Sequence, residues 1–93
     1  MDYGPDDVIE HDAPEPPFRQ LAGIIRARIR RGDWKPRRPI SSESRLGEEY
    51  GLSRPTVRRA IAALVAEDVL FVVPQRGTYV QETGNDEQAG SDK

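Results

Sequence analysis

The sequence contains no cysteine and a single histidine, so two common kinds of functional site lack the residues to form them. Without thiols there is no disulfide framework and no thiolate zinc site. His11 lies in an acidic, proline-containing stretch, and a flexible arm offers no fixed geometry for a metal ion. We therefore expect no catalytic residue, no metal and no cofactor, and the chain is not expected to be an enzyme.

Long apolar runs are also missing from the sequence. No stretch approaches the roughly 20 apolar residues of a membrane-spanning helix. The N-terminus lacks the basic start and the apolar segment of a signal peptide. Ninety-three residues suffice for one small domain. We expect a cytoplasmic protein with no membrane partner.

Basic residues are absent from the start of the chain and concentrated in its centre. Residues 1–16 hold six acidic residues and no lysine or arginine, whereas residues 17–80 hold thirteen of the fourteen basic residues. Composition therefore predicts a disordered acidic N-terminal arm at 1–16, a domain at 17–81 and a flexible acidic tail or linker at 82–93. A basic domain between acidic ends suits a polyanionic partner.

The domain begins with a helical pattern of apolar residues. The residues at this spacing are Phe18, Leu21, Ile24, Ile25 and Ile29. Gly32 is suited to end the helix, because glycine readily adopts the left-handed conformation. A proline-limited connector follows at 33–41, in which Trp34 is expected to anchor the core and Ile40 to lie in a very short strand.

The centre of the chain predicts two helices joined by a tight turn. Residues 43–50 form a short helical pattern, with Ser42 as its N-cap and Gly51 as the residue that ends it. Ser53 then caps a second helix, predicted over 54–67, whose apolar stripe must lie on a core. A short helix, a glycine and a capped basic helix in this order predict a helix-turn-helix.

The first turns of helix 54–67 are basic on the side opposite the apolar stripe. Arg54, Arg58 and Arg59 can contact guanine or phosphate, and the hydroxyls of Ser53 and Thr56 can contact phosphate. Arginines also occur on the outer face of ordinary solvated helices. The preceding helix and turn favour the interpretation as a helix that reads the major groove.

A β-rich run follows the helical part. Residues 69–73 and 78–80 predict two strands, and the residues between them predict a turn with Arg76 at its tip. Such a hairpin is a wing at 69–80, and Arg76 could enter a minor groove or touch phosphate. The predicted fold class is α+β, a small winged helix-turn-helix with three helices and a C-terminal β-hairpin.

In this order the segments resemble the GntR-type winged helix-turn-helix. The matching residues are Gly32-Asp33-Trp34-Lys35-Pro36, Ile40-Ser41-Ser42-Glu43, Leu46, Gly51-Leu52-Ser53-Arg54-Pro55-Thr56-Val57-Arg58, Ala60, Leu64 and Arg76-Gly77-Thr78-Tyr79-Val80. The family consists of bacterial transcription regulators, usually dimers on palindromic operators. It normally carries a C-terminal effector-binding domain, which these residues do not contain.

The resemblance implies sequence-specific binding of double-stranded DNA, with helix 54–67 in the major groove and the wing beside it. Arg54 and Arg58 would contact bases or phosphates, Ser53 and Thr56 would hold the DNA backbone, and Gly77 would let the wing approach closely. The other expected DNA-binding residues are Ser42, Arg45, Arg59 and Arg76. The implied partner is a palindromic operator, bound by a homodimer that forms on the DNA or through a missing C-terminal domain.

Several positions depart from the family pattern. The family usually has glycine where Arg37 and Gln75 stand, proline where Ser41 stands, and a DNA-contacting arginine where Ser44 stands. Neighbouring helix residues point about 100° apart, so Arg45 points in a different direction from the arginine that the family has at Ser44. Basic residues common in the first wing strand are replaced by Val72 and Val73. With Phe71 these valines form either a contact patch for a partner chain or core packing plus one exposed valine.

Two other functions stay open at this point. A winged helix can serve as a protein-interaction module or bind nucleic acid without sequence preference, because a fold does not dictate a function. The segregated charge adds one hypothesis about the arm. If the acidic arm at 1–16 folded back onto the basic face, it would weaken non-specific binding.

Overall fold

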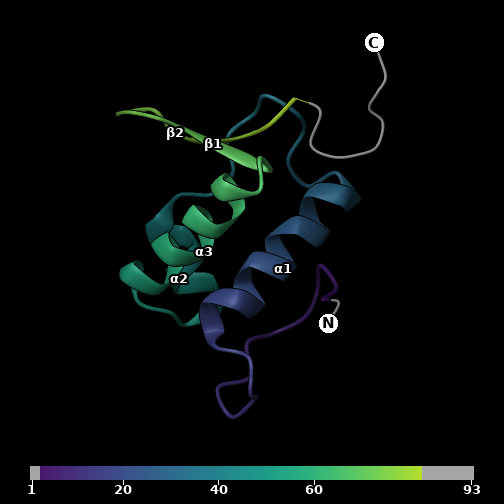
Figure 1. The fold of residues 1–93 in the computed structure, drawn as a ribbon, viewed down its shortest axis with the longest axis vertical. Coiled ribbons are helices and arrows are strands. Elements are labelled where there is room, and N and C mark those ends of the chain that lie inside the picture. Colours follow the sequence, from purple (N-terminus) through teal and green to yellow (C-terminus); the bar gives the residue numbers. More distant parts are fainter. Residues whose placement is uncertain (1–2, 83–93) are drawn as a thin grey trace.

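The computed structural model describes residues 3–82 and confirms the predicted winged helix-turn-helix (Figure 1). The elements are α1 (Pro17–Arg31), α2 (Glu43–Tyr50), α3 (Arg54–Ala66), β1 (Leu70–Val73) and β2 (Gly77–Val80). Within the described part of the chain, no helix is both long and apolar enough to cross a membrane. The predicted tail at 82–93 lies outside the described residues, apart from Glu82.

Local signals set the ends of the helices, as the sequence predicts. The Ser42 hydroxyl accepts a hydrogen bond from the Arg45 N–H at 3.1 Å, and the Ser53 hydroxyl accepts one from the Thr56 N–H at 3.4 Å. These bonds satisfy N–H groups that have no partner inside the helix. Gly51 adopts the left-handed conformation that ends α2. The turn between α2 and α3 is therefore tight and capped on both sides.

The core lies where α1 and α3 pack together, with α2 and the sheet at its edges. Its buried residues are Leu21, Ile25, Ile40, Leu46, Val57, Ala60, Ile61, Leu64, Leu70 and Val80. Trp34 packs against this cluster, as predicted, and the Arg28 guanidinium lies 4.3 Å from the centre of its ring. The apolar stripes predicted for α1 and α3 thus meet in one core that holds α3 in place.

The wing is a two-stranded antiparallel hairpin in which Leu70 pairs with Val80. The rings of Phe71 and Tyr79 stack across the two strands, with centres 5.7 Å apart. Val72 is 56% exposed, whereas Phe71 and Val73 are half-buried. This geometry favours core packing with one exposed valine, Val72, over a broad contact patch for a partner chain.

The connector before α2 pairs with the free edge of the wing. The Arg37 N–H donates to the Val80 carbonyl at 2.8 Å, and the Ile40 N–H donates to the Thr78 carbonyl at 2.9 Å. The short strand predicted at Ile40 forms as a bridge one residue earlier, at Pro39. Strand β2 is therefore hydrogen-bonded along both of its edges, to β1 on one side and to the connector on the other.

The sequence predicts a disordered arm at 1–16, whereas the structure places residues 3–16 along α1. The segment has turns but no helix or strand. The buried Gln20 side chain bonds to its backbone, and Asp6 pairs with Arg31 at 3.0 Å. The hypothesis that the arm covers the basic face is wrong for these residues, because their hydrogen bonds and ion pair join α1 instead.

Candidate nucleic-acid interface

A concavity of about 340 Å³ lies between the wing and the first turns of α2 and α3. Arg54 enters it from α3 and Arg76 from the wing, and Ser42 and Gly77 also line it. Four of the predicted DNA-binding residues, from three elements, therefore share one surface. The fold brings them together because α3 begins directly after the tight turn and the wing is paired with the connector.

Glu43, in the first turn of α2, joins two of the predicted arginines. Its carboxylate accepts hydrogen bonds from Arg58 at 3.0 and 3.2 Å, and it lies 3.9 Å from the nearest Arg54 nitrogen. The hydrogen bonds from Arg58 hold the pKa of Glu43 below its ordinary value, and the same bonds raise the pKa of Arg58. Glu43 and Arg58 therefore both stay charged at neutral pH.

The two arginines remain accessible although Glu43 orients them. The Arg54 side chain is 63% exposed and that of Arg58 is 59% exposed. Exposed guanidinium groups can exchange a carboxylate partner for a phosphate or for the edge of guanine, because both accept two parallel hydrogen bonds. Sequence reasoning missed Glu43, whose only signal is an acidic residue in the first turn of α2, opposite a basic helix start.

The hydroxyls of Ser53 and Thr56 lie side by side at the start of α3. Their oxygen atoms are 3.0 Å apart, and Ser53 also caps the helix. Ser53 is exposed and Thr56 is half-buried. Both lie at a helix N-terminus, where N–H groups and the helix dipole favour an anion.

Two predicted residues lie apart from this cluster. The Arg59 guanidinium lies 4.3 Å from the centre of the Phe18 ring, at the edge between α1 and α3. Arg45 lines a separate depression that also includes Glu48, whereas Ser44 lines the main concavity. Arg45 therefore does not occupy the place of the arginine that the family usually has at Ser44.

The wing tip is built on a tight turn closed by the Arg76 N–H and the Val73 carbonyl at 2.9 Å. Gln75, in this turn, has φ 66°, and Arg37 in the connector also has φ 66°. These are the two positions where the family usually has glycine. At both positions the backbone therefore adopts the left-handed conformation that glycine adopts readily. Gln75 and Arg37 adopt it at a cost in free energy, because their β-carbons crowd the backbone there.

Residues 17–80 match the family described as bacterial regulatory proteins, gntR family. The mannosyl-D-glycerate transport/metabolism system repressor MngR of Escherichia coli K12 is 44% identical over 68 residues, which are 73% of this chain and 28% of that protein. The transcriptional repressor NagR of Bacillus subtilis 168 is 35% identical over 74 residues, or 80% of this chain and 30% of that protein. The chain thus spans less than a third of either relative.

Solved structures show the same fold. The AraR DNA-binding domain, in complex with an operator, superposes with a TM-score of 0.70 at 32% identity and covers 77% of this chain and 88% of that one. YtrA from Sulfolobus acidocaldarius, a GntR-family transcription factor, gives 0.70 at 30% identity and covers 78% of this chain and 77% of that one. With its winged helix fold and a match over residues 17–80, the chain belongs to the gntR family of bacterial regulatory proteins.

Proposed function

We propose that residues 17–81 bind double-stranded DNA in a sequence-specific manner, as part of a cytoplasmic bacterial transcription regulator that is not an enzyme. The observation that carries this proposal is that Arg54 and Arg76 line the concavity between α2, α3 and the wing, and that Arg58 is paired with Glu43, which lines it too. The family and the operator complex of the related AraR domain support the proposal.

In this proposal the first turns of α3 enter the major groove. Arg54 and Arg58 contact guanine edges or phosphates, because a guanidinium matches both in geometry and charge. The capped helix starts at Ser42 and Ser53 hold the DNA backbone. Arg76 reaches the neighbouring minor groove or its phosphates, and Gly77 keeps the wing backbone close.

Two further arginines have a secondary role in DNA binding in this proposal. Arg59 is held against Phe18 and Arg45 lies beyond the concavity, so both are assigned to the flanking phosphates and not to bases. The target is a palindromic operator, bound by two copies that pair on the DNA or through another part of the protein. Phosphate contacts make the affinity fall steeply as salt rises.

The test is selection from a random duplex library with the 93-residue chain, in parallel with Arg54→Ala. If Arg54 reads a base, the substitution lowers affinity for the selected site roughly 5- to 150-fold, which corresponds to about 1–3 kcal/mol. The motif should also become less defined at one position. Arg30→Ala is the matched control, since it removes an exposed arginine from α1 and should leave the motif unchanged.

The other results of this selection favour other functions. Salt-sensitive binding with no enriched motif would indicate a non-specific nucleic-acid-binding module. No binding by a folded sample would favour a protein-interaction module. Either result would contradict the proposed function, whereas a two-fold symmetric motif would support it and give the spacing of the half-sites.

A further inference from the structure

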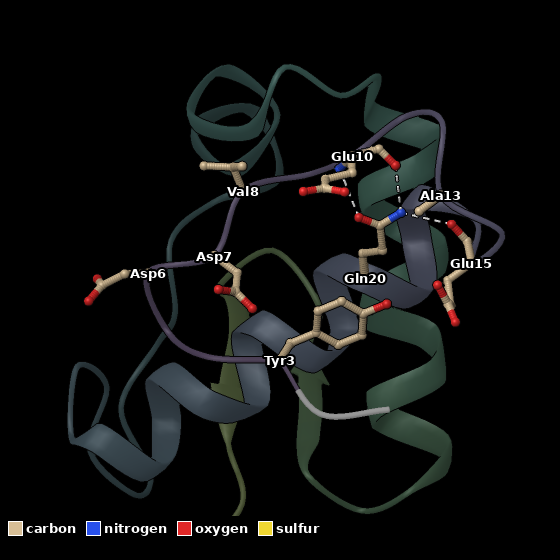
Figure 2. A pocket seen from close by; sticks show the side chains of 8 residues that line it. All are labelled: Tyr3, Asp6, Asp7, Val8, Glu10, Ala13, Glu15 and Gln20. Atoms are coloured by element: carbon tan, nitrogen blue, oxygen red, sulfur yellow. Dashed lines mark hydrogen bonds between the residues drawn. The ribbon is translucent and has the colours of Figure 1, made fainter.

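Gln20 is the one polar side chain buried in the described part of the chain, and its partners all come from the arm. Its Nε2 group donates to the Glu10 carbonyl at 2.9 Å and to the Glu15 carbonyl at 2.7 Å, and its Oε1 atom accepts from the Glu10 N–H at 2.9 Å. Figure 2 shows these three bonds. Because a buried amide without partners is costly, the arm and Gln20 stabilise each other.

Gln20 belongs to a stripe of α1 that the main core does not cover. At 100° per residue, Gln20, Ile24, Ala27 and Arg31 fall within about 60° of one another around the helix. The first three are buried and are not members of the core cluster. Arg31 closes the stripe at the far end of α1 through its ion pair with Asp6. The arm is therefore fastened at both ends of a stripe about 16 Å long.

Apolar contacts lie between these two fastenings. The Tyr3 ring lies so close to Gly23 that a β-carbon there would come within 2.4 Å of it. Ile9 packs against the main core. An arm with a buried hydrogen-bond partner, an ion pair and two apolar contacts is part of the folded domain, although it precedes the residues 17–80 that match the family.

Docking of the arm also fixes where its acidic side chains lie. Asp6, Asp7, Glu10 and Glu15 line one open cavity with Tyr3 and Gln20 (Figure 2). Figure 1 shows the arm on the side of α1 that faces away from α2 and the sheet. In the docked position these carboxylates therefore lie away from the surface that carries Arg54 and Arg58.

We propose that residues 3–16 are a strap that docks on α1 through Gln20 and keeps acidic charge away from the surface that carries Arg54 and Arg58, so that its release weakens DNA binding. The DNA part of this proposal rests on the proposed function. A released strap of 14 residues can reach about 45 Å from residue 17. It can therefore place its carboxylates beside Arg54 and Arg58, where they compete with phosphate.

The first experiment measures amide hydrogen exchange by NMR in the intact 93-residue chain. We expect the Glu10 N–H to exchange at least tenfold more slowly than an unstructured peptide of the same sequence, because its acceptor is a buried side chain. Exchange at the peptide rate would overturn the docking. This result needs no DNA, so it decides the docking even if the proposed function fails.

The second experiment releases the strap with Gln20→Leu, which keeps a side chain of similar size and a strong helix former but removes all three hydrogen bonds. We expect loss of the Glu10 protection, and an affinity for the selected DNA site at least threefold lower in low salt, with the difference vanishing in high salt. Asp12→Asn, at an exposed arm position, is the control and should retain the protection.

A third variant tests the same proposal in case Gln20→Leu does not fold. Asp6→Asn breaks the other fastening at an exposed position, and we expect partial loss of protection with a smaller loss of affinity. If either variant frees the arm and DNA affinity in low salt stays unchanged, the proposed effect of the strap on DNA binding is wrong.

Discussion

Glu43 places a negative charge among cations that face the proposed DNA site. Its pKa is held down by the hydrogen bonds from Arg58, so it stays ionised at neutral pH. An anion at this position lowers the attraction of the surface for any phosphate. It also orients Arg58 through two bonds, which favours a contact of defined geometry over a general one.

Glu43→Gln should therefore raise non-specific affinity and reduce discrimination. We expect several-fold tighter binding to random-sequence duplex in low salt, because a repulsive charge is removed. The affinity for the selected site should rise less, since Arg58 is less firmly oriented. Titrations of both duplexes by fluorescence anisotropy at two salt concentrations measure the two effects.

The matched control for this variant is Glu48→Gln, which removes an acid from the same helix but lines a different depression. It should leave the ratio of specific to non-specific affinity unchanged. An equal ratio in Glu43→Gln and in the parent chain would contradict the assigned role of Glu43.

At the scale of single elements, the turn between α2 and α3 depends on a close contact between Gly47 and the backbone of Leu52. A β-carbon on Gly47 would lie 2.7 Å from the backbone carbonyl oxygen of Leu52. The Leu52 N–H in turn donates to the Gly47 carbonyl at 2.9 Å. The angle between the two helices therefore depends on a residue with no side chain at position 47.

Gly47→Ala should destabilise the domain although alanine is the better helix former by about 1 kcal/mol. Forcing the Leu52 carbonyl aside costs roughly 1–3 kcal/mol, as overpacking does elsewhere. We expect a lower melting temperature by circular dichroism. Ser44→Ala, at an exposed position of the same helix, is the control and should not lower it. A higher melting temperature for Gly47→Ala would show that the contact relaxes freely.

Elements whose signals lie within a few residues could be predicted from the sequence. Ser42, Gly51 and Ser53 mark helix ends by local chemistry, and the structure confirms all three. Gln20 could not be recognised, because a polar residue in a helical pattern is expected to face water and its partners lie five and ten residues away in the arm. Glu43 was missed for the same reason, since Arg58 is fifteen residues away.

Arg59 shows a related limit of predicting the candidate site from the sequence. A helical projection places it on the outer face beside Arg58, and this much is correct because both are exposed. The projection cannot show that the first turn of α1 brings Phe18 beneath its guanidinium. Which exposed arginines cluster on one surface depends on tertiary neighbours, and periodicity carries no information about them.

At the scale of the whole molecule, a group of ion pairs joins α1 to the connector and to α2. Asp33 accepts hydrogen bonds from Arg31 and Arg28 at 2.8–2.9 Å. Arg28 also donates to Glu49 and to the Tyr50 hydroxyl, both at 3.1 Å. The hydrogen bonds from Arg31 and then Arg28 hold the pKa of Asp33 well below its usual range.

This shift predicts how stability depends on pH. A carboxylate with a depressed pKa stabilises the folded state above its unfolded pKa of about 3.9, and this contribution is lost as the pH falls toward the folded value. Asp33→Asn should lower the melting temperature at pH 7 and flatten its decline between pH 5 and pH 2.5. Thermal unfolding at several pH values checks this, with Asp12→Asn as control. Parallel curves for parent and Asp33→Asn would contradict it.

The pairing of the connector with β2 has a consequence for the shape of DNA that the proposed site would accept. A wing bonded through Arg37 and Ile40 to the segment that leads into α2 cannot swing independently of the helices. The distance and the angle between the wing and α3 are therefore fixed. In the proposed complex, we therefore expect weaker binding to duplexes whose minor groove is too wide or too narrow next to the major-groove site, even at base pairs that no side chain touches.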